Sequence, residues 1–85
     1  MKLAKYVKFR QEKFGGVLFE TRSEKVYALN PTAAAVVREI QAGTPEDAIP
    51  ARLKADFDAD EAAQIDREAA AFADQLREQG LVVEE

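Results

Sequence analysis

The spacing of apolar residues changes once along this chain, from every second residue to every third or fourth, and the change falls at Asn30-Pro31. Before it, Val7 and Phe9 alternate with charged residues, which is the pattern of a half-buried strand. After it, apolar residues recur at intervals of three and four, the spacing of one helix face. The chain is therefore predicted to form strands first and helices second, an α+β arrangement.

Three strands are predicted in the first thirty residues, over 5–11, 16–20 and 25–29. Gly15-Gly16 supplies positive φ for a turn or bulge between the first two, and a polar turn over 21–24 separates the second from the third. Short connections between consecutive strands favour an antiparallel meander. A three-stranded sheet with one apolar face is stable only when another layer covers that face.

Helices are predicted to supply that layer, beginning with one that Asn30 caps, that has Pro31 at its first position and that ends at Gly43. Pro50 disfavours helical geometry at the residue before it. A short turn is therefore predicted over 45–49, followed by a second helix from Pro50 to about residue 56.

The last helix is predicted to begin at a cap on Asp58 or Asp60 and to run to Gln79, with a short extended segment over 81–83. The order βββααα, with a tight helix–turn–helix join between the last two helices, predicts a winged helix-turn-helix domain of the α+β class. Residues 1–85 are predicted to form that single domain.

The absence of Cys and His removes thiolate nucleophiles, imidazole bases and the usual zinc ligands. The acidic stretch 56–61 comes nearest to a calcium loop, but it lacks the central Gly and the Glu at the twelfth position. No enzyme, metal site or cofactor is therefore predicted. The first six residues contain no apolar run long enough for a signal peptide or a membrane span, so the protein is predicted to be cytoplasmic.

Charge is distributed unevenly along the chain. Residues 1–38 hold eight Lys/Arg and three Asp/Glu, whereas residues 39–85 hold four and thirteen. A winged helix can be a nucleic-acid-binding regulator, and this alternative is kept, but an acidic last helix is repelled by a polyanion.

The third predicted strand, 25–29, is an edge of the meander, and only Lys25 is an obvious obstacle to its pairing with a further strand. One interpretation is β-augmentation, in which a peptide is added as a fourth strand. The alternative is a structural domain that covers the edge or associates with a second copy through it.

The last helix contains more alanines than one buried stripe requires. Small side chains would leave a groove in which an extended peptide can lie close to the helix. Helix propensity is the simpler explanation, because alanine is the best helix former. An open edge strand beside this helix would favour the groove.

The sequence resembles the PqqD-like domains, the recognition elements of pathways that modify ribosomally made peptides. The resemblance spans residues 7–83 and rests on short motifs in a fixed order. These are Val17-Leu18-Phe19-Glu20, Val26-Tyr27-Ala28-Leu29-Asn30-Pro31-Thr32-Ala33, Val36 to Thr44, and Leu76-Arg77-Glu78-Gln79-Gly80-Leu81-Val82.

The resemblance implies a winged-helix fold and a non-catalytic peptide chaperone. It implies that the leader of a precursor peptide adds as a strand along the third strand, in the groove toward the third helix. The partners would be that leader and a modifying enzyme, often a radical S-adenosylmethionine protein, and the charged strands and helix would flank the peptide with opposite signs. The implied peptide-binding residues are Lys25, Val26, Tyr27, Ala28 and Leu29 on the strand and Asp66, Ala69, Ala70, Ala73 and Arg77 on the helix.

Overall fold

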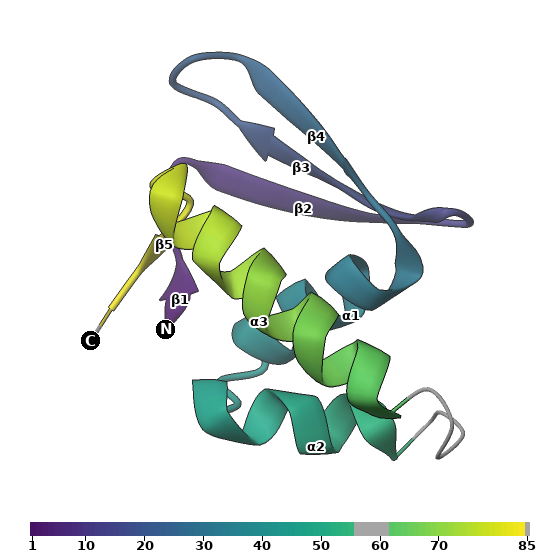
Figure 1. The fold of residues 1–85 in the computed structure, drawn as a ribbon. Coiled ribbons are helices and arrows are strands. Elements are labelled where there is room, and N and C mark those ends of the chain that lie inside the picture. The colour runs from purple at the N-terminus through teal and green to yellow at the C-terminus, as the bar shows by residue number, and fades with distance from the viewer. Residues whose placement is uncertain (56–61, 85) are drawn as a thin grey trace.

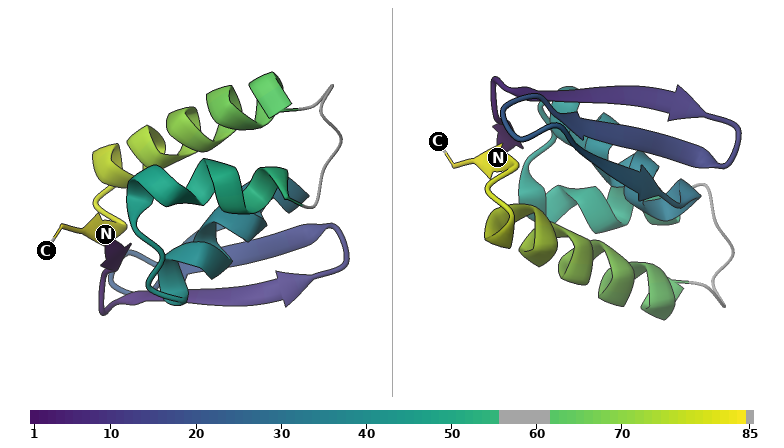
Figure 2. Two further views of the ribbon diagram at one scale, coloured as in Figure 1. Left: turned by 90° about the horizontal axis from the view of Figure 1, so that it is seen from below. Right: turned by 90° about the horizontal axis from the view of Figure 1, so that it is seen from above.

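The computed structural model describes residues 1–55 and 62–84, which form a small sheet with helices packed on one of its faces (Figures 1 and 2). The predicted α+β class, a three-stranded antiparallel sheet followed by helices, is confirmed. In chain order the elements are β1 (Lys2–Leu3), β2 (Val7–Glu12), β3 (Gly15–Glu20), β4 (Lys25–Leu29), α1 (Pro31–Gln41), the 3₁₀-helix η1 (Glu46–Ala48), α2 (Ile49–Lys54), α3 (Ala62–Glu78) and β5 (Val82–Val83).

The main sheet is the predicted meander, with β3 in the middle and β2 and β4 at its edges. Phe9 of β2 lies opposite Leu18, which in turn lies opposite Tyr27 of β4. Because successive side chains of a strand alternate between faces, these three point toward the helices. The same alternation puts the charged residues Lys8 and Arg10 on the outer face.

The change from strand to helix occurs where the sequence predicts it. The Asn30 side chain accepts a hydrogen bond from the Ala33 N–H at 2.8 Å, and Pro31 occupies the first turn of α1. Gly43 follows the end of α1 with φ +86°. Both predicted boundaries of α1 are therefore confirmed.

The core lies where β3, α1 and α3 meet. Its largest fully buried side chains come from all three elements, because α1 is placed between the sheet and the other helices (Figure 2). They are Leu18, Val36, Val37, Ile40 and Leu76. Among the described residues, no helix is both long and apolar enough to cross a membrane.

The two ends of the chain pair with each other, because β1 and β5 form a second antiparallel sheet with Lys2 opposite Val83. The extended end was predicted, but β1 was not, because a two-residue strand has no period to detect. The first long strand begins at Val7 and not at Lys5. Residues 5 and 6 form a turn that is closed by the Val7 N–H donating to the Ala4 carbonyl at 3.0 Å.

The second helix begins one residue earlier than predicted. The predicted turn is found as η1, but Ile49 is already helical, with φ −60° and ψ −47°. Pro50 is accommodated because it lies in the first turn of α2, where a missing N–H costs no hydrogen bond. The predicted end near residue 56, the caps Asp58 or Asp60, the tight join to the last helix and the acidic stretch 56–61 lie outside the described residues.

One buried carboxylate organises the turn that precedes β4. Glu20, 8% exposed, accepts a hydrogen bond from the Arg22 N–H at 2.8 Å and another from the Ser23 hydroxyl. The Ser23 hydrogen bond is the main cause that lowers the pKa of Glu20 below its ordinary value of 4.5, and burial opposes it. The ionised form of Glu20 therefore helps to fix the hairpin that positions β4.

This carboxylate makes stability depend on pH. Because the pKa of Glu20 is lower in the folded protein than in the unfolded chain, its contribution is present above about pH 4.5 and is lost as the pH falls through the folded value. We expect Glu20→Gln to flatten the fall in unfolding free energy between about pH 5 and pH 3. Urea denaturation at several pH values measures this, with the exposed Glu24→Gln in the same turn as control. An unchanged acid dependence in Glu20→Gln contradicts this role.

Candidate functional site

The strand β4 leaves one edge without a partner strand among the described residues (Figure 1). Its other edge pairs with β3, so that Val26 lies opposite Phe19 and Ala28 opposite Val17. Along the open edge, alternate residues present N–H and C=O groups that the sheet does not satisfy. Val26, whose side chain lies on the outer face of β4, is 63% exposed to solvent. The predicted edge position of the third strand is thus confirmed.

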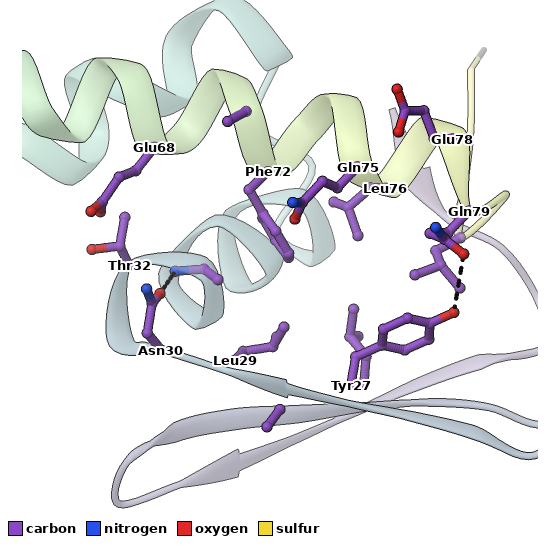
Figure 3. A pocket seen from close by; sticks show the side chains of 15 residues that line it. Tyr27, Leu29, Asn30, Thr32, Glu68, Phe72, Gln75, Leu76, Glu78 and Gln79 are labelled. Atoms are coloured by element: carbon purple, nitrogen blue, oxygen red, sulfur yellow. Dashed lines mark hydrogen bonds between the residues drawn. The ribbon is translucent and has the colours of Figure 1, made fainter.

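A groove of about 590 Å³ lies between this strand and α3 (Figure 3). Its floor consists of the buried side chains Leu18, Leu29 and Leu76, and the half-buried rings of Tyr27 and Phe72 add to it. An extended segment lying beside β4 would place every second side chain over this apolar surface.

Polar side chains occupy both ends of the groove (Figure 3). At one end the Tyr27 hydroxyl donates to Oε1 of Gln79 across a distance of 3.4 Å, which connects β4 to the turn that follows α3. At the other end Asn30 and Thr32, at the start of α1, lie across from Glu68 of α3. The groove is therefore apolar in its middle and hydrogen-bonding at its ends.

The groove is acidic on its helix side. Glu68 and Glu78 are the charged side chains among the described residues that line it. The resemblance implied basic strands on one side of the peptide and an acidic helix on the other. Only the acidic side is present, since the groove lining includes neither Lys25 nor the outer-face cations Lys8 and Arg10.

Of the strand residues predicted to bind a peptide, Tyr27, Ala28 and Leu29 line the groove, whereas Lys25 and Val26 do not. All five still belong to the open-edge strand, so their backbone groups remain candidates for pairing. Their role in binding remains a prediction.

The predicted helix residues lie on the other side of α3. Ala69, Ala70 and Ala73 line a second cleft of about 400 Å³, together with Ile49 and Pro50 of α2. These three alanines thus face α2, whereas Ala71 lines the groove beside β4. Contact of these alanines with a peptide stays a prediction.

The two charged residues of the predicted helix set form ion pairs within the domain. Asp66 pairs with Lys54 of α2 at 3.0 Å. Arg77 donates to Glu46 and, at 2.8 Å, to Glu84, and these carboxylates raise the pKa of the guanidinium above its ordinary value. Arg77 therefore connects α3 to η1 and to the C-terminal segment.

The residues of α3 and of the turn after it that line the groove were not identified from the sequence. The spacing of Phe72 and Leu76 places both on the buried stripe of the helix, and periodicity does not show which neighbouring element lies beside each flank of that stripe. No local signal singles out Gln75, since Gln64, Ala70 and Ala71 of the same helix are also exposed and uncharged. The missed residues are Glu68, Ala71, Phe72, Gln75, Leu76, Glu78 and Gln79.

In the part of the chain that the structure describes, no three Asp or Glu side chains gather closely enough to hold a metal ion. Among the described residues, no hydrogen bond joins either hydroxyl of the groove to a carboxylate: the Tyr27 hydroxyl donates to the Gln79 amide, and Thr32 has no such bond to Glu68. The geometry of the groove suits binding.

Comparisons with known proteins agree with this geometry. Residues 15–82 match the family described as coenzyme PQQ synthesis protein D (PqqD). Two solved structures are similar. One is a lasso peptide synthetase B1 complexed with the leader peptide, with 26% identity, a TM-score of 0.79, and 98% of this chain and 96% of that chain covered. The other is TbiB1 in complex with the TbiA(beta) leader peptide, with 16% identity, a TM-score of 0.81, and 95% of this chain and 93% of that chain covered. No curated protein matches the chain.

Proposed function

The chain belongs to the PqqD family, and on that premise we propose that it binds the leader of a ribosomally made precursor peptide as an added strand on β4. The observation that carries the proposal is the open edge of β4 running beside an apolar groove. An added strand would gain main-chain hydrogen bonds from the edge and would place alternate side chains in the groove.

The solved lasso peptide synthetase B1, 26% identical over nearly the whole chain, is complexed with a leader peptide. This supports a leader as the ligand here. Affinity from main-chain bonds and a few apolar side chains would be moderate, because the peptide loses conformational freedom on binding.

The domain would act without catalysis or cofactors. Residues 1–85 would work in the cytoplasm as one recognition domain that presents the bound leader to a modifying enzyme, for which a radical S-adenosylmethionine protein is the first candidate. The exposed carboxylates of α3, among them Asp66, Asp74 and Glu78, argue against the nucleic-acid alternative.

A fluorescence anisotropy titration tests the proposal. The probe is a labelled synthetic leader from a short reading frame beside the gene for this chain, and a scrambled leader of the same composition is the control. We expect saturable binding of the leader and not of the scrambled peptide. Equal binding of both peptides, or no binding at about millimolar protein, contradicts the proposal for that leader.

A further inference from the structure

The groove beside β4 differs between its two ends, and this difference can select a ligand. The end near Tyr27 is occupied by the uncharged Gln79. The opposite end holds the Glu68 carboxylate, which lies across from Thr32 (Figure 3). Between them Phe72 forms part of the apolar middle. Of the two carboxylates that line the groove among the described residues, only Glu68 lies at the end near Thr32.

Glu68 is available to an incoming cation. It is half-buried and accepts a hydrogen bond from the neutral amide of Gln64 at 3.0 Å, but it has no cationic partner among the described residues. Glu78, the other carboxylate of the groove, lies at the rim with its side chain turned away from β4 (Figure 3). Glu68 is thus the carboxylate that faces the position of an added strand.

The spacing of the helix residues matches that of a strand. Glu68 and Phe72 are one turn apart, which is about 6 Å along the axis of α3. Two residues of an extended peptide span about 6.6 Å and point to the same face. An extended peptide can therefore place one side chain over Phe72 and, two residues away on the same face, another side chain beside Glu68.

We propose that the groove selects an extended peptide with a Lys or Arg two residues before a large apolar residue. The cation would pair with Glu68, and the apolar side chain would cover Phe72 and Leu29. This order follows from antiparallel addition, which is the more stable pairing of two strands. In that pairing the N-terminal part of the peptide lies beside the C-terminal end of β4. Glu68 lies near that end of β4, so it faces the N-terminal part of the peptide. The inference rests on the proposed function and specifies the ligand of the same groove.

A selection from a phage-displayed library of random peptides, about twelve residues long, tests this pattern without a known leader. We expect the selected peptides to share Lys or Arg at one position and a large apolar residue two positions later. The variant Glu68→Lys should select Asp or Glu at the first position. The variant Asp74→Lys has the same charge change on an exposed position of α3 outside the groove and should leave the pattern unchanged.

Synthetic versions of the selected peptides then allow a charge-swap cycle by fluorescence anisotropy. Replacing the peptide cation by Glu should weaken binding about fivefold, which is the upper range for a partly exposed ion pair. Glu68→Lys should restore that loss. Circular dichroism confirms folding, and the near-isosteric Glu68→Gln provides a milder variant.

The possible results separate the two proposals. Peptides that bind without a basic preference, or with the apolar residue first, overturn the selection pattern while leaving strand capture intact. A selection that yields no binding peptide contradicts peptide capture itself, and the selection pattern with it.

Discussion

Replacing Gly15 with alanine is expected to remove about 3–5 kcal/mol of folding free energy, the sum of an overpacking cost and a backbone cost. Gly15 has φ +144°, where side chains are rarely found, and a Cβ built there lies 2.2 Å from the carbonyl oxygen of Leu29 and 2.6 Å from the carbonyl carbon of Asn30. These neighbours are backbone atoms, so they cannot move aside as a side chain does. An 85-residue domain has a total stability of about 4–13 kcal/mol, so the loss is a large part of it.

The matched control is Gly43→Ala, which shares the positive φ but not the crowding. Gly43 has φ +86°, and nothing lies within 4 Å of a Cβ built on it. We expect it to cost about 1 kcal/mol, the backbone term alone. Urea denaturation of both variants measures the difference. Equal stabilities of Gly15→Ala and Gly43→Ala contradict the close approach of β3 to the end of β4.

Replacing Ala71 with tryptophan is expected to weaken leader binding by about tenfold or more. Ala71 is exposed on α3 and lines the groove beside β4, so an indole there occupies the space of the bound segment. Stability should change by less than about 0.5 kcal/mol, because the position is on the surface. Fluorescence anisotropy with the labelled leader measures the affinity, and urea denaturation the stability.

Ala70→Trp is the matched control, since it makes the same change at the adjacent residue. Ala70 is also exposed, but it lines the cleft on the other side of α3. Sequence reasoning named Ala70 as a peptide contact, whereas the groove of the structure contains Ala71. If Ala70→Trp weakens binding and Ala71→Trp does not, the peptide lies on the side of α3 that faces α2 and not in the groove beside β4.

Signals that act within a few residues could be read from the sequence. Asn30 and Pro31 begin α1 as predicted, because the cap and the missing N–H are local effects. The alternation of Val7 and Phe9 with charged residues predicted the first strand and its inner face, which lies opposite Leu18 in the sheet. The edge position of β4 also followed, since short connections leave a meander little choice of order.

Features that depend on distant parts of the chain could not be predicted in this way. The pairing of β1 with β5 joins residues 2 and 83, and nothing local to either strand signals it. Gly15 was recognised as a turn residue, but its close approach to Leu29 depends on the register of β4. The groove side of α3 depends on where α2 packs, so Ala70 and Ala71 could not be told apart by period alone.

The most direct test of the account is an NMR titration of the isotopically labelled domain with the leader peptide, in which every backbone amide is followed. The account predicts that the amides of Lys25–Leu29 shift together with those of Glu68, Phe72 and Gln75 and that all of them saturate at one affinity. If saturating leader shifts the amides of β2, or those around the second cleft at Ala69 and Ala73, and leaves β4 unmoved, then strand addition at this edge is wrong.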